Sequence, residues 1–402
     1  MQHILIISGV FPPEPVTSAI LNYDLAEELS KKYNITVMTP KPSRPMGFEF
    51  NNVATVNTHF NHVVVDSFVC PQSKIRGRFK ESYSFGKQCV KSIRKHHKEI
   101  DFIYNAGWQF ISLYLVAKEC VKYKIPYIVP IQDIYPESIL TKLPNNAILR
   151  KLLKAILSPI DKYYISNATK IRTISNGMAE YLSKTRKIDI NKFLVIANWQ
   201  DDCNFIIPSP SYKKDGKIRF MFAGNNNKQA NVDLIIKGFV AADIPNSELH
   251  IMGGGSAKSD CIKLAQTIHS NNIFFDNIPK GKVPEVQSKA DVLVLALKKG
   301  TGKLGIPSKL TAYMLSGKPI LASLELDSDT ADMIDKAKCG YTVAPDNVDL
   351  LAEQMKNISL LSSESLKTLG DNSRKYAEKH LTKQVNLNKV CQEIDNIIKY
   401  EN

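Results

Sequence analysis

The sequence lacks the patterns that mark membrane-spanning, secreted and metal-binding proteins. No apolar run approaches the ~20 residues of a transmembrane helix. The N-terminal stretch MQHILIISGV has no basic start and no small-residue cleavage site, so we expect a strand there rather than a signal peptide. The seven cysteines form no CxxC pair, which indicates a reducing compartment without a disulfide framework or a zinc site. We therefore expect a cytoplasmic protein.

Common catalytic and phosphate-binding motifs are absent as well. The eight histidines form no HExxH, Ser175 lies in SNG rather than in GxSxG, and no loop matches GxxxxGKS/T or GxGxxG. The sequence therefore supports neither a P-loop protein nor a dinucleotide-binding fold. Asp327 and Asp329 form the one DxD motif, and because no second acidic cluster lies nearby they are a poor candidate for a metal–diphosphate site.

What is present is an ordinary globular composition with an uneven charge. With 402 residues, 44% hydrophobic and 23% charged, the chain is expected to form two domains of about 150–200 residues each. Residues 1–200 carry 27 basic and 15 acidic side chains, a net +12, whereas residues 201–402 carry 26 and 24, a net +2. This excess is either a solvated basic surface or an attraction to an anionic lipid or a phosphorylated acceptor. No recognition motif for nucleic acid is present.

Part of the basic excess lies in residues 143–160, LPNNAILRKLLKAILSPI, where Leu and Ile recur at helical spacing with basic residues between them. This pattern suits a helix lying on a membrane surface, and it equally suits an amphipathic helix packed on a core. The residues alone leave both interpretations open.

Short β-branched runs alternate with helical segments along the chain. In the first half we expect helices at 17–32 and 110–123 and strands at HILIIS, NITVMT, VVVDSFV (63–69), DFIYNA, PYIVPI, KIRTISN and FLVIAN. After a polar, Pro-containing stretch at 198–217 the pattern restarts with strands at KIRFMFAG, SELHIMGGG, NIFFDN, ADVLVLAL, KPILAS and GYTVA, and the end of the chain reads as helices.

This alternation predicts an α/β fold made of two doubly wound, Rossmann-like domains that face a cleft. We expect an N-terminal domain over residues 1–200 and a C-terminal domain over residues 201–379. The last helix, at about 380–402, joins the N-terminal domain if it crosses back. In such sheets ligands bind at the carboxyl ends of the strands.

Three strand ends in the second half carry residues suited to phosphate, because glycine lets backbone N–H groups approach a ligand and a helix N-terminus adds positive charge. We expect Ser308 to cap the helix that follows Pro307. Together the three loops predict a nucleotide-diphosphate site. Their residues are Gly224, Asn225 and Lys228 in the first loop, Gly253, Gly254 and Gly255 in the second, and Gly300, Gly302, Lys303, Gly305, Pro307, Ser308 and Lys309 in the third.

In the first half, the strand PYIVPI runs into QDIYPES, which places Asp133, Tyr135 and Glu137 at a strand end. A carboxylate at that position can orient or deprotonate a hydroxyl group. The alternative is a turn in which Asp133 or Ser138 caps a helix.

Several segments together resemble the GT-B glycosyltransferases of family 4. They follow the order and spacing of that family from residue 3 to about residue 350 and are most similar to the bacterial subgroup that builds O-antigen and capsule sugars. The segments are FPPE after the first strand, QDIYPES, ISNGM, ANWQDD, AGNNN and PSKLTAYMLSGKPI.

The resemblance implies a retaining, metal-independent transfer of a sugar from a UDP- or GDP-sugar. The acceptor would be a polyprenyl-diphosphate-linked glycan in surface polysaccharide biosynthesis, and the enzyme would be peripheral on the inner face of the cytoplasmic membrane, an anionic surface. No cofactor and no nucleic acid are implied. The alternatives are a non-catalytic relative that binds a nucleotide sugar or a partner enzyme, and a nucleotide-sugar epimerase.

The resemblance also implies roles for individual residues. The donor diphosphate would lie against the backbone from Gly305 to Lys309 and near Lys228. The nucleotide base and ribose would lie near Gly253 and Gly254, in the second of the three glycine loops, and near Asn277 and Ile278, which follow the strand NIFFD. The acceptor would enter over the first domain and be oriented by Asp133 and Glu137, near Glu14, Thr17, Ser18 and Tyr135.

The sequence departs from the family pattern at three places. The two glutamates of the E-x7-E motif, of which the second usually holds the ribose hydroxyls, are replaced by Leu304 and Ala312. Lys228 stands where some members have an arginine. Pro15 and Val16 replace the paired glycines after FPPE, so we expect Thr17 and Ser18 to cap the helix that follows.

Overall fold

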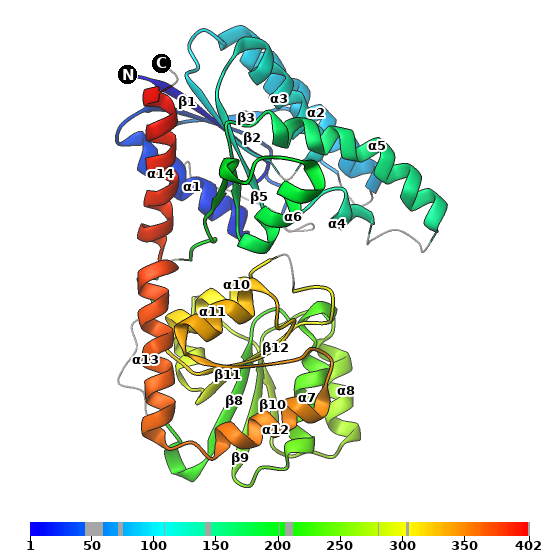
Figure 1. Ribbon diagram of the computed structural model, residues 1–402, viewed down its shortest axis with the longest axis vertical. Coiled ribbons are helices and arrows are strands. Elements are labelled where there is room, and N and C mark those ends of the chain that lie inside the picture. The colour runs from blue at the N-terminus through cyan, green and yellow to red at the C-terminus, as the bar shows by residue number, and fades with distance from the viewer. Residues whose placement is uncertain are drawn as a thin grey trace. The chain divides into compact units, whose positions relative to one another are not determined.

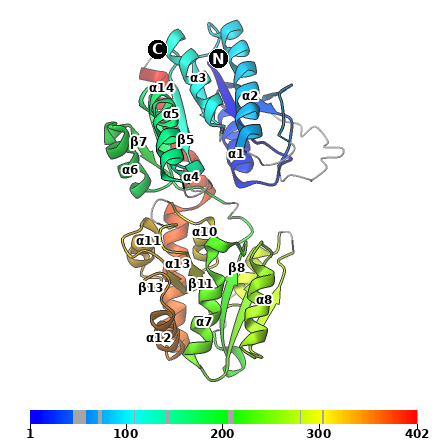
Figure 2. The ribbon, with the colours of Figure 1, turned by 90° about the vertical axis from the view of Figure 1, so that its right-hand side faces the viewer.

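The computed structural model describes residues 1–44, 59–70, 75–107, 109–140, 146–200, 202–205, 212–279, 281–302 and 305–400, and the chain forms two compact units (Figures 1 and 2). Unit 1 comprises Met1–Ile196 and Leu387–Asn402, and unit 2 comprises Ala197–Asn386. The sequence places these limits at residue 200 and at about residue 380.

Unit 1 is built on a seven-stranded parallel sheet with the order β3-β2-β1-β4-β5-β6-β7. Its strands are β1 (His3–Ser8), β2 (Asn34–Pro40), β3 (Asn61–Val65), β4 (Phe102–Ala106), β5 (Tyr127–Ile131), β6 (Lys170–Thr173) and β7 (Phe193–Val195). Ile4, Ile6 and Ile7 of β1 are fully buried. A continuous apolar run is typical of a parallel strand that is covered on both faces.

The strand predicted at residues 63–69 differs from the observed β3. The chain leaves the sheet after Val65, where Asp66 forms an exposed ion pair with Lys41 (2.8 Å). The Phe68 N–H then donates to the Ser84 hydroxyl (2.9 Å) instead of to a neighbouring strand. An edge strand is easily shortened in this way because only one neighbour holds it.

Helices cover both faces of this sheet. They are α1 (Thr17–Ser30), α2 (Ile75–His96), α3 (Phe110–Tyr123), α4 (Glu137–Leu140), α5 (Ala147–Ser166), α6 (Asn176–Arg186) and, from Leu387 on, α14 (Lys383–Tyr400). Along one face α3 packs between α2 and α5, whereas α1 connects β1 to β2 across the other. The carboxylate of Asp395 in α14 accepts hydrogen bonds from Lys32 (2.9 Å) and Tyr33 (2.8 Å), which fixes α14 beside the end of α1.

Unit 2 is built on a six-stranded parallel sheet with the order β10-β9-β8-β11-β12-β13. Side chains along β8 alternate between two hydrophobic clusters: Phe220 and Phe222 join one, and Met221 and Ala223 join the other. This period of two shows that both faces of the sheet are covered. The strands are β8 (Ile218–Ala223), β9 (Ser247–Met252), β10 (Ile273–Asp276), β11 (Val292–Ala296), β12 (Ile320–Ser323) and β13 (Gly340–Val343).

The helices of unit 2 form two layers. Helix α7 packs against α12 on one side, whereas α10 and α11 pack against α13 on the other. Their bounds are α7 (Val232–Ala242), α8 (Lys258–Thr267), α9 (Val283–Ser288), α10 (Ser308–Leu315), α11 (Asp329–Ala337), α12 (Val348–Ser359) and α13 (Ser363–His380).

In each sheet the direction of strand succession reverses once, between β1 and β4 in unit 1 and between β8 and β11 in unit 2. Such switch points are where open α/β sheets bind ligands. In unit 2 the Tyr313 hydroxyl of α10 lies at this point: it accepts from the Ala223 N–H (2.8 Å) and lies 3.5 Å from the Val294 carbonyl oxygen. The predicted fold class, two Rossmann-like α/β domains, is confirmed.

Candidate active site

The loops that follow β8, β9 and β10 in unit 2 are joined by backbone hydrogen bonds. The N–H of Gly224 donates to the Met252 carbonyl (2.9 Å), that of Asn226 to the Gly254 carbonyl (2.8 Å), and that of Gly253 to the Asp276 carbonyl (2.9 Å). These bonds bring three of the predicted glycines together at the carboxyl edge of the sheet.

Two of these glycines cannot be replaced by a larger residue without displacing a neighbour. Gly224 has φ +150° and Gly253 has φ +123°, values that favour glycine. A Cβ atom at Gly224 would overlap the side chain of Lys309, and a Cβ atom at Gly253 would overlap the Gly224 carbonyl oxygen. The loop after β8 is therefore packed against the Lys309 side chain, and the loop after β9 is packed against the loop after β8.

Lys309 is a half-buried cation at the start of α10. Its Nζ lies 5.4 Å from the centroid of the Phe222 ring. Across the part of the chain that the structure describes, it forms no ion pair and no side-chain hydrogen bond. Burial lowers the pKa of the Lys309 ammonium group below its ordinary value. A cation that is desolvated and lacks a carboxylate partner is stabilised by an anionic ligand.

The predicted capping role of Ser308 is wrong. Pro307 occupies the N-cap position, with φ −60° and ψ 130°, and Ser308 is the first residue of the helix. Because proline fixes φ and has no polar side chain, no side chain caps α10. The Ser308 carbonyl accepts a hydrogen bond from the Gln200 side chain (2.7 Å), and Gly305 lies in the preceding loop. Lys303 and Leu304 lie outside the described residues.

The residues expected near the nucleoside lie at the same edge. The Asn277 amide oxygen accepts from Lys258 (2.8 Å), and a Cβ atom at Gly254 would lie 4.0 Å from that oxygen. Ile278 packs against the cluster that Met252 and Ile306 also join. Asn225 and Lys228 lie exposed in the loop after β8, where Asn227 caps a short 3-10 turn, Lys228–Ala230.

Two further residues of this edge were not singled out from the sequence. Asn226 is fully buried, and within the described ranges its Nδ2 has no hydrogen-bond partner. Glu325, after β12, accepts a hydrogen bond from the Gly300 N–H through its Oε1. Its buried Oε2 has no hydrogen-bond partner within the described ranges. Asn226 stands among three consecutive asparagines that only the tertiary structure distinguishes, and Glu325 belongs to no motif. Ala312, where the family has a glutamate, is buried in α10.

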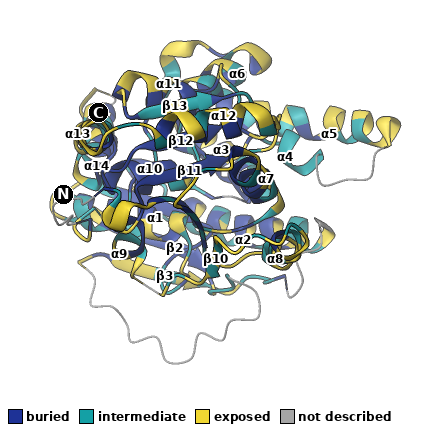
Figure 3. Cartoon of the chain, turned by 90° about the horizontal axis from the view of Figure 1, so that it is seen from below, coloured by how far each residue is buried: buried dark blue, intermediate teal, exposed yellow. Residues whose placement is uncertain are grey.

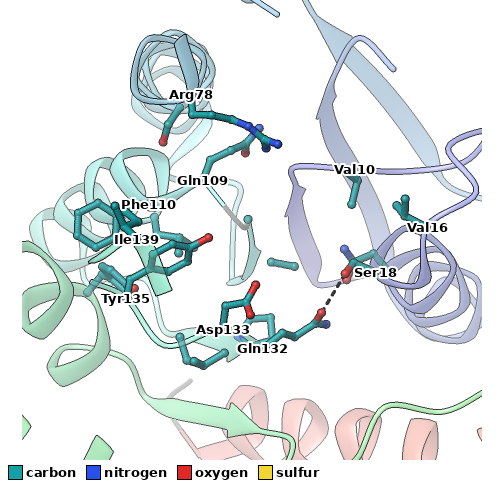
Figure 4. A pocket seen from close by; sticks show the side chains of 18 of the residues that line it. Val10, Val16, Ser18, Arg78, Gln109, Phe110, Gln132, Asp133, Tyr135 and Ile139 are labelled. Carbon is teal, nitrogen blue, oxygen red and sulfur yellow. Dashed lines mark hydrogen bonds between the residues drawn. The ribbon is translucent and has the colours of Figure 1, made fainter. Parts of the chain in front are cut away.

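Unit 1 contains a pocket of about 550 Å³ at its own switch point (Figure 4). The loops after β1, β4 and β5 and the helices α1, α2 and α3 supply most of its wall. Of the residues predicted on the acceptor side, Ser18, Asp133 and Tyr135 line it, and Glu14, Thr17 and Glu137 do not. Burial, followed by the charge of Asp133, raises the pKa of the Tyr135 hydroxyl to about 12.

Glu14 and the start of α1 have structural contacts. The buried Glu14 carboxylate accepts from the N–H groups of Phe11 (3.0 Å), Ser43 (2.8 Å) and Arg44 (2.8 Å). Burial raises the Glu14 pKa, and these hydrogen bonds offset only part of that rise. The expected capping of α1 by Thr17 and Ser18 is wrong: Val16 is the N-cap residue and no side chain caps the helix. Ser18 instead donates to the Gln132 side chain (2.9 Å).

Glu137 is bound by its neighbours. Its carboxylate accepts two hydrogen bonds from Arg186 (both 2.8 Å) and one from the Tyr181 hydroxyl (2.9 Å). Burial alone would raise the Glu137 pKa, but these hydrogen bonds outweigh it and hold the pKa below its ordinary value. Of the two carboxylates predicted to orient the acceptor, Asp133 is therefore the one that lines the pocket.

Two features are absent from the described residues. They contain no group of three or more His, Cys, Asp or Glu side chains that could hold a metal ion, and Ser328, between Asp327 and Asp329, caps α11. None of their helices has both the length and the apolar character required to cross a membrane.

Solved structures share this architecture, and several of them are named as glycosyltransferases. HepE from Anabaena, solved in complex with UDP, has a TM-score of 0.71 at 13% identity and covers 98% of this chain and 100% of its own. WaaG, a glycosyltransferase involved in lipopolysaccharide biosynthesis, has a TM-score of 0.64 at 15% identity and covers 99% of this chain and 100% of its own. The fold of this chain is therefore GT-B, with two Rossmann-like domains.

Sequence comparison gives the family. The model described as "Glycosyltransferase Family 4" matches residues 19–202, and the one described as "Glycosyl transferases group 1" matches residues 206–376. WbjE of Pseudomonas aeruginosa, a probable glycosyltransferase, is 24% identical over 293 residues, which are 69% of this chain and 70% of WbjE. The chain belongs to family 4 of the GT-B glycosyltransferases and is an enzyme of that type, as its motifs predicted.

Proposed function

We propose that this enzyme transfers a sugar from a UDP- or GDP-sugar, with retention of configuration, to a polyprenyl-diphosphate-linked glycan in surface polysaccharide biosynthesis. The family assignment supports glycosyl transfer, and the complex of HepE with UDP supports UDP as the first nucleotide to test. The role of WaaG in lipopolysaccharide biosynthesis supports a surface polysaccharide as the product.

One observation carries the proposal: the half-buried side chain of Lys309, whose ammonium group has no partner among the described residues, lies against Gly224 at the start of an uncapped helix. A diphosphate placed there would meet a cation, the positive end of α10 and the backbone of the loops after β8 and β9. These groups stabilise the charge that develops on the leaving diphosphate, which is the main contribution of the protein in this reaction.

The proposed reaction needs no metal ion, because Lys309 and the backbone N–H groups supply the positive charge. The acceptor oxygen forms a bond to the anomeric carbon on the face that the diphosphate leaves, and the sugar–phosphate bond breaks. The acceptor proton passes to the departing phosphate oxygen. Asp133 has the role of orienting the acceptor hydroxyl in the pocket of unit 1.

Association with a membrane surface belongs to the proposal as well. Four apolar side chains on the first turns of α5 are exposed: Ile148 (82%), Leu149 (38%), Leu152 (58%) and Ile156 (55%). Ile148, Leu152 and Ile156 recur every four residues and so share one side of the helix, with Lys151 and Lys154 beside them. Figure 3 shows the same part of α5 coloured largely as exposed. An exposed apolar stripe edged by cations suits the surface of an anionic bilayer.

The test of the activity is incubation of the purified enzyme with UDP- and GDP-sugars and a membrane extract that contains lipid-linked glycans, with transfer and donor hydrolysis both measured. Transfer from one donor is the expected result. Nucleotide binding with neither transfer nor hydrolysis would favour a non-catalytic relative, for which the loss of the glutamate at Ala312 is a reason. A donor converted to its epimer without acceptor would point to an epimerase.

The donor site is tested by replacing Lys309. We expect Lys309→Ala to weaken nucleotide binding by roughly 1–3 kcal/mol, the range for a lost charge-assisted hydrogen bond. Titration calorimetry with UDP and GDP measures this loss. Lys356→Ala, at an exposed lysine of α12, is the matched control and should leave the affinity unchanged. Equal affinity for Lys309→Ala and the parent chain would place the diphosphate elsewhere.

A further inference from the structure

The pocket of unit 1 contains a buried amide group that no described protein group satisfies. Gln109, just before α3, is 1% exposed, and neither its Oε1 nor its Nε2 has a hydrogen-bond partner within the described ranges. An unsatisfied buried polar group costs roughly 1–3 kcal/mol. Figure 4 shows the Gln109 side chain in the pocket, with the ends of Gln109 and Arg78 pointing toward each other. Such a pair of unused donor and acceptor indicates a polar ligand.

The lining is also electropositive. Arg44, Arg78 and Arg172 line the pocket, whereas Asp133 is the one carboxylate among the lining residues that the structure describes. Arg44 is paired with Glu81 (3.0 Å), and Arg172 donates to the Ile196 carbonyl (3.3 Å). Burial, followed by the charge of Arg44, lowers the pKa of Arg78. An anion beside Arg78 would therefore relieve an unfavourable accumulation of positive charge.

The pocket has two polar ends and apolar walls between them. Figure 4 shows Arg78 and Gln109 at one end and Asp133, Gln132 and Ser18 at the other. Between these ends stand apolar and aromatic side chains, among them Val10, Phe110 and Ile139. The volume of about 550 Å³ lies in the range of small-molecule sites. Such a lining suits a ligand with an anionic group at one end and a hydroxyl group at the other.

We propose that the pocket binds an acidic sugar of the acceptor, with its anionic oxygen group, a carboxylate or a phosphate, against Arg78 and Gln109 and with a hydroxyl group toward Asp133. The inference rests on the proposed function, because it specifies the chemistry of the acceptor in that reaction. The Arg78 guanidinium binds two oxygens of the anion at once. The Gln109 Nε2 donates to the same group, and its Oε1 accepts from a neighbouring sugar hydroxyl.

The experiment uses the full chain with labelled methyl groups, because Leu113, Ile131 and Ile139 line this pocket. The probes are methyl β-glucuronide, which carries a carboxylate, glucose 1-phosphate, which carries a phosphate, and the neutral methyl β-glucoside. We expect saturable shifts of the pocket methyl signals with at least one charged probe, at an affinity about tenfold or more above that for the neutral probe. The probe that binds more tightly identifies the source of the anion.

Variants assign the effect to the two residues. We expect Arg78→Gln to remove the preference for the charged probes, Arg78→Lys to keep part of it, and Gln109→Leu to weaken binding about threefold or more. Arg76→Gln, at an exposed position of the same helix, is the matched control and should bind as the parent chain does. Equal binding of charged and neutral probes, an unchanged preference in Arg78→Gln, or no pocket shift with either charged probe would overturn the proposal.

The donor experiment keeps this result separate from the proposed function. Nucleotide binding and transfer are measured without these probes, and nucleotide binding depends on the proposed donor site in unit 2. Intact donor binding and transfer together with a failed probe titration would reject the acidic acceptor alone. Absence of transfer together with selective binding of a charged probe would reject the proposed reaction and leave the anion site in place.

Discussion

At the scale of single residues, Lys318 is a buried cation at the other end of α10 from Lys309. Its side chain is 0% exposed, its Nζ has no hydrogen-bond partner in the described parts of the chain, and it lies 4.8 Å from the centroid of the Tyr212 ring. Burial lowers the Lys318 pKa to about 8, although the charge of Asp291 opposes the shift. The ammonium group is thus unfavourable where it stands.

This gives a pH-dependent stability with a definite sign. Between pH 8 and pH 10.5 the unfolded chain holds more protons at Lys318 than the folded chain does, so the free energy of unfolding rises with pH in that window. We expect Lys318→Met to raise the melting temperature at pH 7 by roughly 2–4 °C, the effect of ~1 kcal/mol. We also expect this variant to lose the increase in the free energy of unfolding between pH 8 and pH 10.5. The Asp291 carboxylate keeps its bonds from the N–H groups of Lys213 and Arg219. Thermal unfolding at several pH values measures both effects. A lower melting temperature than the parent and the Lys356→Met control would show that Lys318 stabilises the fold.

At the scale of elements, Arg186 holds together the helices next to the pocket of unit 1. Its guanidinium, at the end of α6, binds Asp161 of α5 (2.7 Å), Glu137 of α4 (2.8 Å) and the Tyr135 carbonyl (2.5 Å). Because Tyr135 lines the pocket, this network positions the segment that begins at Asp133.

Removal of this cation should destabilise unit 1. Arg186→Met leaves the buried Asp161 and the partly buried Glu137 without their cationic partner, and we expect a loss of about 3–5 kcal/mol in the free energy of unfolding, as for a buried ion pair that is broken on one side. Urea denaturation measures the change. Lys336→Met, which breaks the exposed pair with Asp332, is the control and should cost less than about 1 kcal/mol. Similar losses for the two variants would contradict the role of Arg186.

At the scale of the whole molecule, the basic excess of residues 1–200 and the apolar stripe of α5 lead to a membrane prediction. We expect the triple variant I148S/L152S/I156S to bind phosphatidylglycerol vesicles with an affinity lower than that of the parent chain by roughly tenfold or more. The reason is that three aliphatic side chains are no longer available to be buried in the bilayer surface. Vesicle co-sedimentation at moderate salt measures the binding. The variant L350S/L360S, at exposed leucines of unit 2, should bind normally. Undiminished binding of the triple variant would mean that α5 is not the contact.

The sequence predicted the strands and their class because parallel strands covered on both faces are continuous apolar runs, as in HILIIS and VLVLAL. It also predicted the glycine loops, because a strand that ends in glycine and opens a helix is a local pattern. The predicted helix caps were wrong. Ser308 and Thr17 are the first residues of their helices and Ser18 is the second, and the N-cap residues Pro307 and Val16 have no polar side chain.

The sequence by itself determined the family and the fold class, since motif order and hydrophobic period are local properties of the chain. The tertiary structure alone decided which side chains meet at the carboxyl edge of each sheet. It paired Glu137 with Arg186, left Lys309 and the Gln109 amide without a partner among the described residues, and placed Asp133 in the same pocket as Arg78. Burial and pairing depend on residues far apart in the sequence, so no local pattern contains them.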